Sequence, residues 1–324
     1  MSITIRESLT LKSGTSESAP VRYLDTVDAY NEWAKVYDSD GNFLQALDTL
    51  EMQTMLPSFL RVVSSYFQPD DAPTMKLVDL GCGTGRNTMQ LFLTAPKNVD
   101  IIGLDASPGM LDVARRNLRK VGIASGHSDD EDNNCSANQD DQFEVTSPRE
   151  INMVSLNLFN ILSWPRMLFP RSCYASTSTS SIATAPGDDI DISTTDTEVG
   201  VAGVISTLVV EHIPLDLFFQ CVSALLLPGG YLLLTNMHSE MGEISQAGFI
   251  DEATGTKIRP ETSYCHRIAD VLSVAERTGL EVIGDVRERT VDETLVEVLG
   301  RRARKWVGVK VWFGVLFRKK TSVS

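Results

Sequence analysis

The sequence lacks the marks of a disulfide-bonded, zinc-binding or membrane-spanning protein. Its five cysteines are scattered and odd in number, and no two of them form a C-x-x-C pair, so neither a disulfide framework nor a zinc site is predicted. The first residues have no apolar signal-peptide core. The most apolar later run, residues 215–234, is interrupted by Pro228-Gly229-Gly230, which indicates a helix, a turn and a strand. We therefore expect a soluble, cytoplasmic protein.

Basic residues are also scarce. The chain has 29 Lys and Arg against 43 Asp and Glu, a formal net charge of −14. Much of this acidic excess lies in two stretches, 124–148 and 171–200, and the rest of the chain is close to neutral. Because a protein that binds nucleic acid neutralises phosphates with a basic surface, the composition argues against a nucleic-acid substrate.

Three segments show little sign of regular structure. Residues 1–22 indicate a flexible arm. The acidic, Asn-rich stretch 124–148 predicts a disordered insertion, and 165–200, with its Ser/Thr run, predicts a surface loop. The 324 residues, of which 42% are hydrophobic, allow one large domain or two small ones with a substantial core.

The rest of the chain is organised around the stretch from Lys76 to Thr88. Its apolar residues predict a short buried strand, which three alternate glycines, Gly81, Gly83 and Gly85, end abruptly. Such glycines let the backbone approach a ligand where a side chain would collide. A ligand-binding loop is therefore predicted directly after the strand.

Two carboxylates accompany this loop. Asp79 stands two residues before the first glycine, and a second strand-like run, 99–104, ends in Asp105, where a carboxylate could bind both hydroxyls of a ribose. A simple chain reversal would explain the glycines, and a helix cap would explain Asp105. Neither explains a strand, a carboxylate, three glycines, a second strand and a second carboxylate in this order. A nicotinamide-dependent enzyme is the serious rival, although its glycine pattern is G-x-G-x-x-G rather than G-x-G-x-G.

Together these residues resemble the first two motifs of class I S-adenosylmethionine-dependent methyltransferases. The resemblance implies an α/β, Rossmann-like fold with a seven-stranded, mostly parallel sheet, an antiparallel last strand, helices on both faces and an N-terminal helical cap. We expect the arm and cap over residues 1–70 and the cofactor-binding domain over 71–324, with a substrate-covering segment at 238–266. S-adenosylmethionine is the implied cofactor, S-adenosylhomocysteine is its product, and no metal is expected.

The resemblance also implies a set of cofactor-binding residues. They lie on the helix before the glycine strand, in the glycine loop and at the ends of later strands: Tyr30, Tyr37, Asp79, Gly81, Cys82, Gly83, Gly85, Asn87, Asp105, Ala106, Met110, Asn157, Leu158 and Leu208. Asn157 departs from the family, which often has an Asp there that contacts the adenine amino group. Ser107-Pro108 predicts the N-cap and first turn of the helix after Asp105.

Histidine is the residue type that suggests the chemistry. His127 lies in the acidic insertion and is taken as incidental, whereas His212 and His238 follow two predicted strands and His266 opens a later helix. Ligands of open α/β sheets bind beyond the carboxyl ends of the strands. We therefore expect His238 or His212 to be a general base, with Glu211 orienting one of them and His266 nearby.

Five further residues are expected to contact the acceptor: Trp33, Asn236, Met237, Phe249 and Tyr264. For Trp33, which shares a helix face with Tyr30 and Tyr37, an aromatic stripe packed on the core is an equal alternative.

The predicted function is methyl transfer to a small, polycyclic secondary metabolite such as an alkaloid or polyketide. O-methylation is preferred because histidines line the expected acceptor site. The alternatives are N- or C-methylation, including that of a quinone precursor, and a cofactor-binding regulatory subunit without activity. The two insertions suggest a eukaryotic, fungal enzyme. No membrane partner is expected, and the oligomeric state is left open, with a homodimer among the alternatives.

Overall fold

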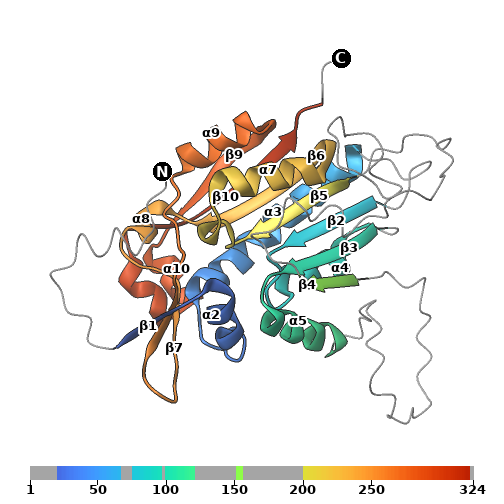
Figure 1. Cartoon of the computed structure of the whole chain (residues 1–324). Helices are drawn as coiled ribbons and strands as arrows, with labels where there is room; N and C mark the ends of the chain where they lie inside the picture. Colours follow the sequence, from blue (N-terminus) through green and yellow to red (C-terminus); the bar gives the residue numbers. More distant parts are fainter. Residues whose placement is uncertain (1–19, 67–74, 97–98, 121–150, 156–199, 322–324) are drawn as a thin grey trace, which may run out of the picture.

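A mixed seven-stranded sheet forms the centre of the molecule (Figure 1). The computed structural model describes residues 20–66, 75–96, 99–120, 151–155 and 200–321. In sheet order the strands are β4 (Ile151–Ser155), β3 (Val99–Asp105), β2 (Met75–Leu80), β5 (Val201–Thr207), β6 (Leu226–Met237), β10 (Lys310–Lys319) and β9 (Leu280–Thr290). The pairings from β4 to β6 are parallel, and β10 runs antiparallel to both its neighbours. The predicted sheet, with its antiparallel last strand, is confirmed.

The strands carry apolar residues on both faces because helices cover both. On one face α3 (Phe43–Tyr66) and α4 (Arg86–Thr94) pack in a cluster that includes Leu77 of β2. On the other, α7 (Leu215–Leu225) and α9 (Ile268–Arg277) share a cluster with Val78, the next residue. This alternation is the period-2 geometry of a strand buried on both sides. Pro57 disfavours a helix interior, yet it lies inside α3 and the helix continues past it.

β2 leads through the glycine loop into α4, and β3 leads into α5 (Pro108–Lys120). The Ser107 hydroxyl accepts a hydrogen bond from the Met110 N–H at 3.1 Å, which confirms the predicted N-cap. The Pro228-Gly229-Gly230 segment, predicted as a turn before the fifth strand, lies within β6, where the pairing with β5 shifts register between Val201 and Gly203.

A second, three-stranded sheet was not predicted. It has the order β1-β8-β7, formed by β1 (Val21–Leu24), β8 (Lys257–Pro260) and β7 (Phe249–Ile250). The arm predicted over residues 1–22 is therefore wrong at Val21 and Arg22, which pair in parallel with Lys257 and Ile258. Sequence patterns miss β1 because four residues are too few to show a strand pattern, and an edge strand of this length is recognised only by its pairing with a neighbouring strand. The pairing joins the N-terminal cap to the segment expected to cover the substrate.

The cap helix α2 (Thr26–Trp33) follows β1 directly (Figure 1). The Asp25 carboxylate accepts the Val27 N–H at 2.9 Å and so caps its first turn. The helix ends at Trp33, and turns follow it.

The remaining short elements are η3 (Val210–His212), α8 (Ser239–Gly242), α10 (Glu293–Leu299) and η4 (Arg301–Trp306). Across the described ranges, no helix has the length and apolar character needed to cross a membrane. The stretch 124–148, nearly all of 165–200, and residues 1–19 lie outside the described residues.

Candidate active site

The loop after β2 takes a shape that its glycines allow. Gly81, Gly83 and Gly85 have φ angles of +78°, +55° and +83°, in the left-handed region that side chains disfavour. A Cβ on Gly81 would collide with the Val209 side chain, so that position is closed by packing. A Cβ on Gly83 would meet no atom within 4 Å. The loop is therefore packed beneath Gly81 and open beside Gly83, where a ligand can lie.

A cavity opens beside this loop, at the carboxyl ends of β2, β3 and β5. Its lining residues are Thr26, Val27, Tyr30, Tyr37, Gly81, Gly83, Asp105, Ala106, Ser107, Met110, Thr207, Leu208, Val209 and His212. This edge is where open α/β sheets bind ligands. Eight of the residues predicted to bind the cofactor are among them: Tyr30, Tyr37, Gly81, Gly83, Asp105, Ala106, Met110 and Leu208. The structure thus gathers the predicted glycine loop, strand-end carboxylate and tyrosines around one space.

Asp105 joins two walls of this cavity. Its Oδ2 accepts the Gly83 N–H at 2.8 Å, and its Oδ1 accepts the Ser107 N–H at 2.8 Å. A carboxylate oxygen can accept more than one hydrogen bond, so both oxygens keep capacity for ligand hydroxyls. Burial raises the pKa of Asp105, against the lowering effect of these backbone donors. This geometry fits the ribose-binding role implied by the resemblance.

Asp79 lies below the glycine loop and does not line the cavity. Its Oδ2 accepts the Thr88 hydroxyl at 2.6 Å, whereas its Oδ1 is buried without a hydrogen-bond partner. Burial raises the pKa of Asp79 to about 7, against the hydrogen bond from Thr88. An unpartnered buried carboxylate oxygen favours a cationic group close to the loop.

Tyr30 and His212 face each other across the cavity. The Tyr30 hydroxyl lies 2.8 Å from His212 Nε2, and His212 Nδ1 lies 2.9 Å from the Thr262 carbonyl oxygen. Since a carbonyl only accepts, Nδ1 carries a proton, and the neutral ring accepts the Tyr30 hydroxyl at Nε2. In the neutral ring, Nε2 of His212 is therefore an acceptor, and the Tyr30 hydroxyl occupies it.

Glu211 modifies this histidine. Its Oε1 lies 3.4 Å from His212 Nε2, and its Oε2 is buried without a hydrogen-bond partner. Burial lowers the pKa of His212, but Glu211, the Thr262 carbonyl and Asp105 together raise it by more, so the pKa stands above its ordinary value. The carboxylate thus favours the protonated imidazole, which is what a general base becomes during reaction.

The other two candidate histidines lie away from the cavity lining. His238 Nε2 is 3.0 Å from Glu288 Oε1, which also accepts the Lys310 ammonium at 2.9 Å. His266 Nε2 donates to the carbonyl oxygens of Val210 and Ile213 at 3.1 and 3.0 Å. These contacts occupy Nε2 of both rings, and of these three histidines His212 is the one that lines the cavity.

The residues predicted to contact the acceptor do not line this cavity either. Trp33 stacks on Phe249 with ring centroids 5.4 Å apart and donates its Nε1–H to Asp40 at 2.7 Å. Tyr264 stacks on His266 at 5.3 Å. Asn236 and Met237 are buried at the end of β6. Trp33 and Phe249 hold the small sheet on the cap helix, as the core-packing alternative for Trp33 foresees.

Three predicted cofactor residues support the loop from behind. Cys82 packs among Leu111, Ala114 and Leu118. Gly85 is the N-cap of α4, and the Asn87 side-chain amide donates to the Thr207 hydroxyl at 2.8 Å. Asn157 and Leu158 lie outside the described residues.

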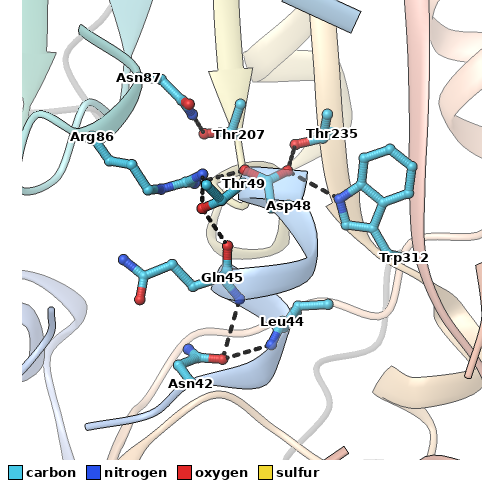
Figure 2. A network of polar contacts seen from close by, with 10 residues as sticks. All are labelled: Asn42, Leu44, Gln45, Asp48, Thr49, Arg86, Asn87, Thr207, Thr235 and Trp312. Carbon is cyan, nitrogen blue, oxygen red and sulfur yellow. Dashed lines mark hydrogen bonds and ion pairs between the residues drawn. The ribbon is translucent and has the colours of Figure 1, made fainter. Parts of the chain in front are cut away.

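A buried ion pair fastens the glycine loop to the sheet (Figure 2). Arg86, the first residue of α4, donates to the Asp48 carboxylate on α3 at 2.6 Å. The other oxygen of Asp48 accepts the Thr235 hydroxyl at 2.5 Å and the Trp312 Nε1–H at 3.0 Å. One carboxylate therefore joins α3, α4, β6 and β10 below the site. No sequence motif indicates this network.

Leu208, directly after β5, also lines the cavity and has a φ of +57°. Among the described residues it is the one non-glycine position with a positive φ. Strain of this kind costs of the order of 1 kcal/mol and is concentrated at functional sites. The described residues contain no group of three or more His, Cys, Asp or Glu side chains that could hold a metal ion.

Comparison with known proteins places this geometry in a family. A family model described as a methyltransferase domain matches residues 71–165. An uncharacterized methyltransferase of Emericella nidulans is 47% identical over 312 residues, which cover 93% of each chain. A magnesium-protoporphyrin O-methyltransferase of Rhodobacter capsulatus is 29% identical over 90 residues, 28% of this chain and 38% of that protein. A solved magnesium protoporphyrin IX methyltransferase of Synechocystis is 13% identical, covers 94% of this chain and 100% of its own, and has a TM-score of 0.47.

Proposed function

Because the chain belongs to the S-adenosylmethionine-dependent methyltransferases, we propose that it methylates a hydroxyl group of a small polycyclic metabolite, with His212 as the general base. The observation that carries this proposal is the Tyr30–His212–Glu211 arrangement at the cavity, in which Nε2 of the neutral His212 ring is an acceptor. One relative over a short stretch is named for O-methylation. The apolar and aromatic lining of the cavity, with Tyr30, Tyr37, Met110 and one histidine, suits a flat apolar acceptor.

The residues at the cavity fit the cofactor. Asp105 would accept the ribose hydroxyls, and the open space beside Gly83 would let the ligand lie against the backbone. S-adenosylmethionine supplies an electrophilic methyl group on a positively charged sulfur. Asp105 and the ring of Tyr30 line this cavity and Glu211 lies beside His212, and each of these groups would favour a cation there.

Positioning is the first contribution of the chain to the reaction. Residues of the cap helix and of the glycine loop both line the cavity and would orient the acceptor hydroxyl toward the cofactor. Such orientation can supply about 7–11 kcal/mol of the barrier.

Proton removal is the second contribution. An acceptor hydroxyl takes the place of the Tyr30 hydroxyl at His212 Nε2 and gives its proton to that nitrogen. The Glu211 carboxylate, 3.4 Å away, stabilises the imidazolium that forms, and the Thr262 carbonyl keeps the ring in place. General base catalysis of this kind contributes about 10²–10⁴ in rate.

The test compares His212→Ala with His238→Ala on a panel of hydroxylated polycyclic acceptors, with S-adenosylmethionine binding followed by calorimetry. We expect His212→Ala to lower kcat by at least about 100-fold while cofactor affinity stays within a few-fold. His238→Ala is the matched control, since its ring contacts Glu288 away from the cavity, and its turnover should stay near that of the unmodified chain. Equal turnover in both variants would refute the role of His212.

The products of the same panel separate the alternatives. A product methylated on nitrogen or on carbon would show that the enzyme catalyses N-methylation or C-methylation in place of O-methylation. Cofactor binding without any methylated product would instead favour a regulatory subunit.

A further inference from the structure

One side chain holds the cap helix α2 on the amino end of α5. Asn31 Oδ1 accepts the Ser107 hydroxyl at 2.7 Å and the Gly109 N–H at 2.9 Å. The Gly109 N–H belongs to the first turn of α5, where backbone donors have no partner inside the helix. Asn31 therefore supplies an acceptor from α2 to the end of another helix.

The two helices approach closely at this point. A Cβ on Gly109 would stand 3.1 Å from Asn31 Oδ1 and 3.2 Å from both Cα and the carbonyl oxygen of Asn31. Two of these three atoms are backbone and cannot swing away. A glycine in the first turn of a helix is a weak helix former, so its presence here is explained by the closeness of α2.

The contact lies between two parts of the active site. On α2, Tyr30 precedes Asn31, lines the cavity and bonds His212. On the other side, the Ser107 N–H donates to Asp105, the expected ribose-binding carboxylate. Asn31 is thus linked through Ser107 to Asp105 on the cofactor side, and through Tyr30 to His212, the proposed base.

We propose that Asn31 is a positioning residue, which locks α2 onto α5 and so sets Tyr30 over the cofactor and against His212. The proposal rests on the proposed function, because it assigns Asn31 a role at the same site. Asn31 does not line the cavity, so it acts through Tyr30 and Ser107 and not by contact with the ligand.

Variants of Asn31 should fold, since α2 has other attachments. β1 pairs with β8, Trp33 stacks on Phe249, and Asp38 accepts the Thr84 hydroxyl at 2.7 Å. Loss of one attachment therefore changes the placement of the helix and leaves the chain folded.

The experiment measures S-adenosylmethionine and S-adenosylhomocysteine binding by calorimetry in the full chain, together with thermal melting without ligand. Asn31→Leu removes the acceptor oxygen at similar size, and we expect the Kd for S-adenosylmethionine to rise by about tenfold or more. Asn31→Asp keeps an acceptor for both donors and places a negative charge at a helix amino end, so it should bind within about threefold of the unmodified chain. Asp28→Leu, at an exposed position one turn earlier on α2, is the matched control and should leave Kd unchanged.

A second variant separates positioning from simple stability. Gly109→Ala improves the helix propensity of α5, but its Cβ pushes against the Asn31 backbone. Because these two effects on stability oppose each other, ligand-free melting should change little while cofactor affinity falls. Unchanged affinity in Asn31→Leu or in Gly109→Ala, or an equal loss in Asn31→Asp, would overturn the role of Asn31. If the unmodified chain binds no S-adenosylmethionine, the proposed function itself fails, which is a different result.

Discussion

Replacement of Asp48 by alanine should be among the most destabilising single changes in this chain. Its carboxylate is fully buried and accepts from Arg86, Thr235 and Trp312, and the last two are themselves buried (Figure 2). Asp48→Ala leaves two buried donors without an acceptor and a guanidinium without its counter-charge. Breaking a buried ion pair from one side costs about 3–5 kcal/mol. Because the Arg86 side chain is 22% exposed and water can reach it, we expect a loss of unfolding free energy at the lower end of this range, about 3 kcal/mol.

Urea unfolding followed by tryptophan fluorescence and far-ultraviolet circular dichroism measures this change. Asp48→Leu and Arg86→Met are the two single variants of a double-mutant cycle, and the chain that carries both replacements completes it. Since the paired replacement leaves no lone buried charge, it should cost less than the sum of the single changes by about 1 kcal/mol or more. A loss below about 1 kcal/mol in Asp48→Ala, or strict additivity in the cycle, would refute the reasoning.

Three further predictions concern the glycine loop and the proposed base. Burial raises the pKa of Asp79 to about 7, so the folded chain keeps this proton while the unfolded chain releases it near pH 3.8, and stability falls as pH rises between the two values. Asp79→Asn should therefore have a higher melting temperature than the unmodified chain at pH 8, and this difference in melting temperature should become smaller toward pH 5. A difference that stays constant between pH 5 and pH 8 would contradict the prediction. Gly81→Ala should destabilise the chain by about 1–3 kcal/mol in urea unfolding because of its collision, whereas Gly83→Ala should cost less and mainly weaken cofactor binding in calorimetry. Glu211→Gln should lower the pKa of His212 and move the rising limb of the kcat/KM profile to lower pH, since the base acts when deprotonated, and an unmoved limb would count against the pair.

The parts of the fold that follow from local patterns could be predicted from the sequence. The alternating strands and helices, the glycine loop and Asp105 each depend on residues close together in the chain, and the sheet and cavity contain them as expected. The N-cap at Ser107 is equally local.

Side-chain partners far apart in the sequence could not be predicted. Asp48 meets Arg86, Thr235 and Trp312 across separations of 38, 187 and 264 residues. His238 follows a strand, as a catalytic histidine often does, yet the antiparallel neighbour β10 and the adjoining β9 bring Lys310 and Glu288 to it. The carboxyl end of a strand is visible in the sequence, but the direction of the next side chain depends on which strand pairs beside it.

The small sheet has a practical consequence for anyone who prepares this protein. An expression clone that starts at Thr26 would discard β1, which pairs with β8 and lies beside α2 (Figure 1). β8 would then present an open row of backbone amides and carbonyls, a template for pairing with other chains. Poor solubility of such a clone would reflect a missing edge strand and not an unstable enzyme.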